Sequence, residues 1–458
     1  MDNDPAFAVL LRDAAERAIA YRATLDGRPQ RPEQDFVAAR DSWAAPVPEQ
    51  GAPAGAVIAE LDALARPGLH AMTGARFFGW VIGASHPVGV AADWLTSAWG
   101  QNAGNHLASP ASAAAEAVAE RWLLDVLRLP DTCSVGFVTG ATMANVVGLA
   151  AARGAVLRPL GWHVEAQGLF GAPPIRVLLG EEAHATVLMA LQFLGLGHDR
   201  VERVATDAQG AMRPDALRDA LARGGGPCIV AIQAGQLNTG AFDPAAALIA
   251  LARDAGAWVH VDGAFGLWAR TSARHAHMAD GFDGADSWAT DGHKWLQTPY
   301  DCGFAIVRDG DAHRRAMALV ASYLPTVAAG ERDPSHYVPE LSRRARGFAT
   351  WAMLRHLGRE GIARMVERHC RLARLVAAEM DAEPGIAVLN DVVLNQVILR
   401  FGDDDAATRR TIARLQADGV CFAGGAQWKG RWVMRISVSG WPTTEADAQR
   451  SAEAIRTA

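Results

Sequence analysis

Lys294 has the surroundings best suited to covalent chemistry in this sequence. It lies in the segment 291–296 (DGHKWL), which follows a short apolar stretch at 287–289. Bulky apolar neighbours solvate a charged amine poorly, which favours the neutral amine that attacks carbonyl carbons. Most lysines are surface residues, so this segment alone is weak support. It nevertheless predicts a lysine that bonds covalently to an aldehyde or a ketone.

Asp262 supplies a second signal. It ends the apolar segment 258–262, which we expect to be a strand, and ligands of open α/β sheets bind beyond the carboxyl ends of strands. Pyridoxal phosphate (PLP) needs an anionic partner at its pyridine nitrogen, because the protonated ring withdraws electrons from a bound substrate. Asp262 is a candidate for that partner, and Ala264 is small enough to lie flat against the ring. The structural alternative is an aspartate that caps a turn or a helix.

Two further segments suit the same cofactor. The segment 139–145 (TGATMAN) passes from an expected strand into a helix, and small residues at a helix N-terminus expose N–H groups that bind phosphate. The segment 181–186 (EEAHAT) follows another strand and contains His184, which would stack on the ring face opposite Ala264. Each signal is weak alone, because such turns are common and a single histidine is more often structural.

Composition and charge argue against several other classes of protein. The chain has 458 residues, a formal net charge of −6 at pH 7 and 50% apolar residues, which is typical of a globular enzyme and argues against nucleic-acid binding. Its 5 cysteines include no CxxC pair, so we expect reduced thiols and neither a disulfide framework nor a metal site. The acidic N-terminus and the lack of a long apolar run predict a cytoplasmic protein without a signal peptide or a membrane span.

Alternating strands and helices must position the candidate residues. We expect strands at 136–139, 176–179, 203–205, 228–233, 258–262, 287–289 and 303–307, with helices at 143–157, 186–194, 214–222 and 244–254 between them. This alternation predicts an α/β fold with a mostly parallel sheet of seven strands, covered by helices on both faces. After about residue 342, a long helix and short strands at 388–389, 395–401 and 431–437 predict a smaller α+β domain.

The N-terminal region has no obvious core of its own. An amphipathic helix at 6–25 is followed by a proline-rich stretch that runs to Pro53. We therefore divide the chain into an N-terminal helical segment at 1–65, a large cofactor domain at 66–341 and a small C-terminal domain at 342–458. The first segment is expected to pack on another surface.

Together these segments resemble the group II PLP-dependent amino-acid decarboxylases, which include aromatic-amino-acid and glutamate decarboxylases. The His-Lys-Trp context, the Val-Asp-x-Ala strand end, the Ala-His-Ala-Thr segment and the segment 342–346 (SRRAR) occur in the family's order. The similarity runs from about Phe77 to the C-terminus. It implies an aspartate-aminotransferase-like (fold type I) homodimer with active sites at the subunit interface, and an N-terminal segment that packs on the partner subunit.

The resemblance also implies roles for individual residues in binding PLP. Lys294 would carry PLP as a Schiff base, Asp262 would pair with the pyridine nitrogen and His184 would stack on the ring. Ala141 and Thr142 would bind its phosphate, and His293 would lie near the phosphate. Asn238 or Thr239 would lie beside the cofactor, and Ala264 would lie on the ring face opposite His184.

The substrate pocket is less well defined by the sequence. The resemblance implies a contribution from Trp80, and from the neighbouring subunit's segment that contains Trp99, Asn102 and His106. Either tryptophan is equally well explained as a core residue. Arg435 is expected in a structural ion pair, with contact to a substrate carboxylate as the alternative.

One feature departs from the family. Animal aromatic-amino-acid decarboxylases carry a tyrosine on a mobile loop that helps to protonate the substrate after CO2 leaves, and Pro334 stands at the corresponding position here. Tyr337 is the nearest phenol, and Tyr323 lies where the loop begins. We expect Tyr337 to be the proton donor, with anchoring of the loop as its alternative role and His184 or Lys294 as alternative donors.

The expected function is decarboxylation of an L-amino acid to its amine. An aromatic or otherwise hydrophobic substrate is favoured, because no basic cluster demands an acidic side chain. The alternatives on the same fold are an aldehyde synthase, which combines decarboxylation with oxidative deamination, and a C–C lyase or aldolase. A catalytically silent, PLP-binding scaffold is the alternative from a different class.

Overall fold

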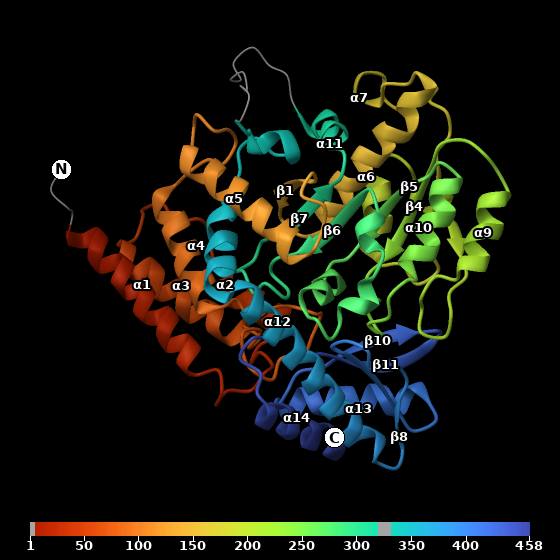
Figure 1. Cartoon of the computed structure of the whole chain (residues 1–458). Helices are drawn as coiled ribbons and strands as arrows, with labels where there is room; N and C mark the ends of the chain where they lie inside the picture. Colours follow the sequence, from red (N-terminus) through yellow and green to blue (C-terminus); the bar gives the residue numbers. More distant parts are fainter. Residues whose placement is uncertain (1–4, 319–330) are drawn as a thin grey trace.

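A sheet of seven strands forms the centre of the larger part of the molecule. The structure is a computed structural model that describes residues 5–318 and 331–458 (Figure 1). The strand order is β1-β7-β6-β5-β4-β2-β3. Within it, β7 runs antiparallel to both of its neighbours and the remaining pairs are parallel. The strands are β1 Ser134–Val138, β2 Arg176–Gly180, β3 Glu202–Val204, β4 Cys228–Gln233, β5 Trp258–Asp262, β6 Ser287–Asp291 and β7 Gly303–Val307.

Helices cover both faces of this sheet, as the sequence predicts. The side chains of β4 alternate: Ile229 and Ala231 pack beneath one set of helices, whereas Val230 and Ile232 pack beneath the other. This two-sided burial explains why the strands are nearly continuous apolar runs. The predicted α/β fold with a mostly parallel seven-stranded sheet is confirmed. The helices of this part are α4 Pro87–Trp99, α5 Pro110–Val126, α6 Ala141–Leu157, α7 Val164–Gln167, α8 Ala185–Phe193, α9 Pro214–Ala222, α10 Ala245–Asp254 and α11 Gly310–Met317.

A second sheet lies in the C-terminal part of the chain. Its four strands have the order β10-β11-β9-β8, and all three pairs are antiparallel. The sequence pattern does not predict β10, because its glycines and its half-exposed residues give no apolar run. The elements are β8 Ile386–Val388, β9 Gln396–Phe401, α13 Asp405–Asp418, β10 Gly424–Trp428, β11 Arg431–Ser437 and α14 Glu445–Thr457.

The long helix α12 (Arg346–Asp381) connects the two sheets. Its backbone departs from helical geometry at Gly358, where φ is 59°, a conformation that favours glycine. Met353, Leu354, Ile362, Val366 and Cys370 belong to the core of the large sheet, and the buried residues from Leu372 onward belong to the core of the small sheet. The helix therefore fixes how the two parts meet.

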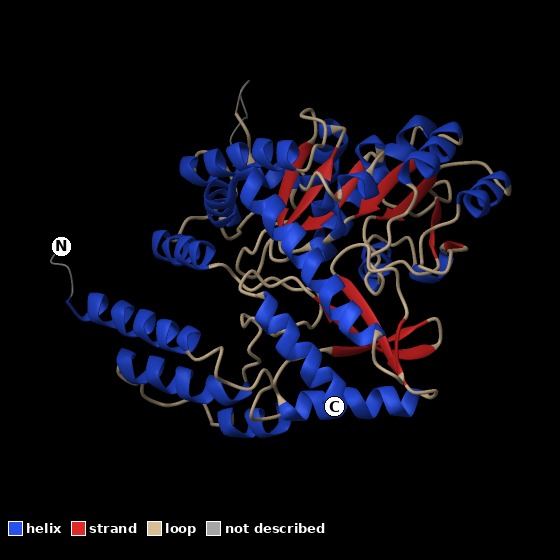
Figure 2. Ribbon diagram, turned by 60° about the horizontal axis from the view of Figure 1, so that its bottom comes forward, coloured by secondary structure: helices blue, strands red, loops and turns tan. Residues whose placement is uncertain are grey.

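Three N-terminal helices extend away from both sheets, as Figure 2 shows. They are α1 (Pro5–Ala23), α2 (Phe36–Trp43) and α3 (Ala54–Ala65), and α1 packs along α3. The expected first helix is confirmed, but α2 lies within the stretch that the sequence analysis left without a helix. Neither α2 nor α3 has a fully buried residue. None of the helices in the described ranges is long and apolar enough to cross a membrane.

Candidate active site

The carboxyl ends of several parallel strands bring the main predicted residues to one edge of the large sheet. Asp262 is the last residue of β5, Lys294 follows β6, His184 follows β2, and Ala141 begins α6 just after β1. Strands β1 and β6 point the same way, because each is antiparallel to β7. This is the edge at which open α/β sheets bind ligands.

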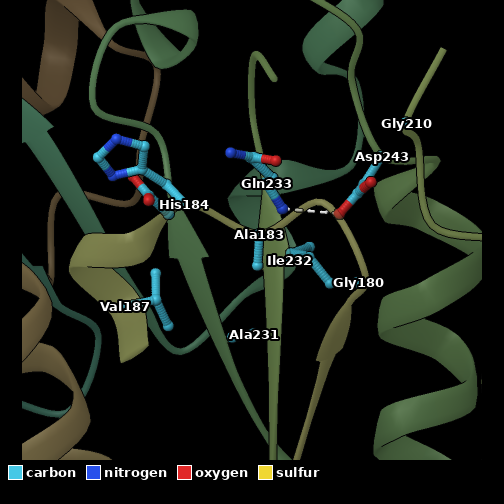
Figure 3. Close-up of a pocket in the computed structure, with 10 residues that line it drawn as sticks. Gly180, Ala183, His184, Val187, Gly210, Ala231, Ile232, Gln233 and Asp243 are labelled. Carbon is cyan, nitrogen blue, oxygen red and sulfur yellow. Dashed lines mark hydrogen bonds between the residues drawn. The ribbon is translucent and has the colours of Figure 1, made fainter. Parts of the chain in front are cut away.

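Asp262 and His184 line the same small pocket. Figure 3 shows His184 at one side of it, and Asp243, which accepts the Gln233 N–H, at the other. Asp262 is 5% exposed, and among the described residues its carboxylate accepts one hydrogen bond, from the Ala264 N–H over 3.2 Å. Burial raises the pKa of Asp262, although the neighbouring charges of His184 and Lys294 oppose that rise. Asp262 is therefore a buried acid that a cationic ligand group would stabilise.

His184 is held in one orientation at the start of α8. Its Nδ1 accepts the Thr186 N–H over 3.3 Å and lies 2.7 Å from the Thr186 hydroxyl. Burial lowers the pKa of His184, and the negative charge of Asp262 offsets part of that effect. A fixed, neutral imidazole is suited to stacking on a flat ring.

Lys294 points toward a carboxylate and an aromatic ring. Its Nζ lies 3.0 Å from Asp291 Oδ2 and 5.9 Å from the centre of the Phe265 ring. The backbone here is fixed by Gly83, whose N–H donates to the His293 carbonyl over 2.9 Å. A Cβ at Gly83 would lie 2.4 Å from the Lys294 carbonyl oxygen, so this close approach requires glycine.

The N-terminus of α6 presents free N–H groups to the same edge. The N–H groups of Thr142 and Met143 donate to no acceptor among the described residues. The Ala141 N–H donates to Asp291 Oδ1 over 2.6 Å. Of the two residues predicted to bind phosphate, Thr142 therefore has an available donor, whereas the donor of Ala141 is engaged by Asp291. A helix N-terminus of this kind attracts anions.

His293 borders this anion site. A Cβ at Gly140 would lie 3.0 Å from its Cε1, so the helix start packs directly against the imidazole. The Nδ1 of His293 accepts the Cys302 N–H over 3.2 Å, and Tyr300 stacks on its ring at 4.4 Å. Burial lowers the pKa of His293, and the nearby Asp291 carboxylate raises it.

Arg435 of β11 contacts Asn238, which lies with Thr239 in the loop after β4. The N–H groups of Asn238 and Thr239 donate to Gln236 Oε1, over 2.6 and 3.0 Å. Arg435 reaches Asn238 Oδ1 at 3.4 Å and pairs with no carboxylate of the described residues. Burial lowers the pKa of Arg435 to about 10, and its charge lowers the pKa of His184. The structural ion pair expected for Arg435 is absent from the described residues, so its guanidinium is available to an anionic ligand.

Trp80 belongs to an aromatic cluster and is 51% exposed. Its ring lies 5.7 Å from Phe77, 5.9 Å from His70 and 5.3 Å from Phe422. Trp80 and the following Val81 both have a φ of 55°, which is rare for residues with side chains of this size. Trp80 is therefore not a core residue.

Among the described residues of their own subunit, Trp99, Asn102 and His106 contact none of Lys294, Asp262 and His184. They contact the first turn of α12 and the residues before it instead. Trp99 packs on the Phe348 ring at 5.0 Å, Asn102 Oδ1 accepts the Arg343 N–H at 3.1 Å, and His106 Nδ1 lies 2.5 Å from Asp333 Oδ1. Their predicted role in the pocket of a neighbouring subunit stays a prediction.

Tyr337 is held against β1 and α11. The Arg332 guanidinium lies 4.3 Å from its ring, and the His313 ring meets it edge-on at 5.2 Å. The His313 Nε2–H donates to the Tyr337 carbonyl over 2.9 Å. These contacts fit the alternative role of loop anchor. Among the described residues of this subunit, Tyr337 contacts none of Lys294, Asp262 and His184. Tyr323 lies outside the described residues.

The family model described as the pyridoxal-dependent decarboxylase conserved domain matches residues 39–401. The chain belongs to this family. It is therefore a PLP-dependent amino-acid decarboxylase, and the cofactor and the reaction type predicted from the sequence are confirmed.

Several characterised proteins are similar to this decarboxylase. The aromatic-L-amino-acid decarboxylase of Bacillus atrophaeus is 28% identical over 81% of this chain and 78% of its own length. The phenylacetaldehyde synthase of Arabidopsis thaliana is 26% identical over 85% of this chain and 82% of its own. The crystal structure of Oryza sativa TDC with PLP and tryptamine superposes with a TM-score of 0.92 at 24% identity, covering 100% of this chain and 98% of that one. This last similarity confirms the fold.

The site of this decarboxylase fits PLP on structural grounds. The buried Asp262 carboxylate accepts one hydrogen bond among the described residues, from the neutral Ala264 N–H. A positive group such as a protonated pyridine nitrogen would therefore stabilise its charge. Thr142 and Met143 offer N–H groups to a phosphate, and Lys294 supplies the amine. The sequence analysis assigned no role to Asp291 or Met143, although both lie in segments that it singled out. The position of Asp291, a carboxylate at the end of a strand and just before Lys294, could have identified it from the sequence.

Proposed function

We propose that this decarboxylase converts an aromatic or otherwise hydrophobic L-amino acid to its amine. Relatives that act on aromatic amino acids support this substrate class. The cluster of Trp80, Phe77 and Phe422 offers aromatic surface close to Gly83, which contacts the Lys294 backbone. The observation that carries the proposal is the grouping of three residues around His184: Lys294, the buried acid Asp262, and Arg435, which pairs with no carboxylate of the described residues.

PLP, when bound, supplies a ring that withdraws electrons from the substrate bond to the carboxylate. Lys294 would hold the cofactor covalently, and Asp262 would keep a proton on its pyridine nitrogen. His184 and Ala264 would confine the two faces of the ring, while Asn238 and Thr239 would lie at its edge. Thr142, Met143 and His293 would hold the phosphate. After CO2 leaves, a proton must reach the substrate carbon, and His184 and Lys294 are the proposed donors, while Tyr337 is proposed to anchor the loop.

Arg435 is proposed to orient the substrate. An unpaired, partly buried guanidinium is unfavourable unless an anion meets it, and the α-carboxylate of an amino acid is such an anion. Arg435 donates to Asn238, which comes from the loop after β4, so the same guanidinium links the small sheet to the cofactor side. Holding the carboxylate in place would also exclude water from that side of the site.

An aldehyde synthase is the second candidate function. One of the relatives is a phenylacetaldehyde synthase, so this product class occurs among proteins similar to this chain. No observation on the described residues favours a C–C lyase or aldolase, and the family match argues against the catalytically silent scaffold.

We further propose a cytoplasmic homodimer in which Trp99, Asn102 and His106 complete the partner's substrate pocket. A groove of about 900 Å³ runs between the N-terminal helices and α4, lined by side chains such as Leu61, Leu69 and Trp94. Leu61 and Trp94 are 48% and 45% exposed in the single subunit. An apolar surface of this size favours burial against a second copy of the chain.

The experiment that tests the function is a screen of the twenty amino acids for CO2 release, with amine and aldehyde both quantified. Borohydride reduction followed by peptide mass spectrometry should place the pyridoxyl label on Lys294, and Lys294→Ala should abolish turnover. Amine from an aromatic or aliphatic substrate supports the proposal. Aldehyde with peroxide supports the second candidate, and a label on another lysine contradicts the site.

A further inference from the structure

We propose that Asp291 is a positioning residue that orients Lys294 at the expense of phosphate affinity. The inference rests on the proposed function, because it concerns the phosphate end of the same cofactor site. Asp291 ends β6, and its side chain is 3% exposed. Neither the strand pattern nor the family match gives it a role.

The carboxylate of Asp291 joins two parts of the site that come from distant parts of the sequence. Its Oδ1 accepts the Ala141 N–H over 2.6 Å, and its Oδ2 lies 3.0 Å from Lys294 Nζ. The Nε2 of His293 lies 3.4 Å from Oδ1. One side chain therefore ties the lysine to the N-terminus of α6, where the phosphate would be held.

The Asp291 carboxylate lies at the N-terminus of α6, where its negative charge would repel a bound phosphate. It accepts the first N–H of α6, from Ala141. The next two N–H groups, of Thr142 and Met143, donate to no acceptor of the described residues and are available to a phosphate. A phosphate monoester carries about −1.5 to −2 charges near neutral pH, and like charges at close range in a buried site repel strongly.

The other charged and titratable groups near Asp291 offset this repulsion incompletely. Burial lowers the pKa of His293, which disfavours its cationic form. Lys294 is the nearest fixed cation, and its ammonium is engaged by Asp291 Oδ2 at 3.0 Å. Asp262 and Tyr300 also face Asp291, and neither adds a positive charge. Removing the charge of Asp291 should therefore strengthen phosphate binding.

The test compares Asp291→Asn with Asp301→Asn in the full-length chain. Asparagine keeps the shape and can still accept the Ala141 N–H through its carbonyl oxygen, while its NH2 group replaces both the negative charge and the oxygen that faces Lys294. Asp301 pairs with Arg346 at 2.8 Å. It faces His293, as Asp291 does, but among the described residues it has no hydrogen bond to Ala141 and no ion pair with Lys294. Inorganic phosphate is titrated into protein stripped of PLP and followed by calorimetry. The rate at which unphosphorylated pyridoxal is trapped on Lys294 by borohydride is measured in parallel.

We expect Asp291→Asn to bind phosphate at least about tenfold more tightly than the parent and to trap pyridoxal several-fold more slowly. Asp301→Asn should stay within about twofold in both measurements. Asp291→Ser, which also keeps a neutral acceptor, should change both in the same direction as Asp291→Asn. A merely structural role predicts weaker phosphate binding in both Asp291 variants.

Phosphate affinity that is unchanged or lower in both variants overturns the inference, provided that PLP still loads on Lys294 of the parent. Failure of the parent to form a reducible adduct at Lys294 overturns the proposed function instead, and the inference with it. The two failures are therefore separate results.

Discussion

Trp295, the residue after Lys294, donates its indole N–H to His369 Nδ1 over 2.8 Å. The Nε2–H of the same imidazole donates to the Gly440 carbonyl over 3.0 Å. His369 lies in α12 and all three groups are buried or nearly so, which ties the lysine segment to both parts of the molecule. Because one ring nitrogen accepts and the other donates, the contact requires the neutral imidazole.

Stability should therefore fall in mild acid. Burial lowers the pKa of His369 from 6.5 to about 3, so the unfolded chain binds a proton that the folded chain excludes. The contribution of His369 is complete above about pH 6.5 and is lost as the pH falls toward 3, by up to about 1.4 kcal/mol per pH unit. Urea unfolding at several pH values should show His369→Gln with a smaller slope than the parent. The exposed His198→Gln is the control, and equal slopes in all three proteins would contradict the assignment.

Asp262→Asn should slow decarboxylation more than a hundredfold at saturating PLP. Loss of a buried ion pair costs about 3–5 kcal/mol, which corresponds to that factor in rate. His184→Ala should be milder, since stacking contributes about 0.5–1.5 kcal/mol. Steady-state CO2 release measures both. Activity of the Asp262 variant within tenfold of the parent would remove the pyridine-nitrogen role.

Arg435→Met should raise KM for the amino acid and leave PLP retention unchanged. The reason is that Arg435 has no carboxylate partner in the described residues and would gain one from the substrate. We expect at least a tenfold change, in line with about 1.5–3 kcal/mol for a hydrogen bond to a charged group. Arg431→Met, on the exposed start of the same strand, is the matched control. An equal effect of both variants would indicate a structural role for the strand's charges.

Light scattering should give a mass near twice the 48.6 kDa of one chain. Trp94→Glu places a charge in the apolar groove beside the N-terminal helices and should produce an inactive monomer. Phe170→Glu alters an exposed aromatic residue outside the groove and should remain a dimer. A fully active monomer in the Trp94 variant would exclude an active site shared between subunits.

Tyr337→Phe should leave the amine rate and the product ratio within about threefold of the parent, because its ring and carbonyl are held by Arg332 and His313 in an anchoring arrangement. Stopped-flow absorbance and product analysis with an aromatic substrate measure the effect. A tenfold slower amine rate with more aldehyde would instead restore the predicted role of proton donor.

The sequence by itself determined the sheet and the residues at its carboxyl edge. β4, β5 and β7 occur at the predicted bounds, because each is a continuous apolar run whose burial on two faces leaves a local pattern. Asp262 ends one such strand, and His184 and Lys294 come shortly after two others. Once the strands are parallel, chain direction alone brings these residues to the same edge.

Contacts between distant segments were decided by the tertiary structure. Asp291 and Ala141 are 150 positions apart, and nothing local to either shows that one accepts from the other. Arg435 belongs to the small sheet, so its lack of an ion-pair partner depends on how that sheet meets the large one. The strand β10 and the exposed helix α2 left no apolar pattern, because burial, the source of such patterns, is slight in each.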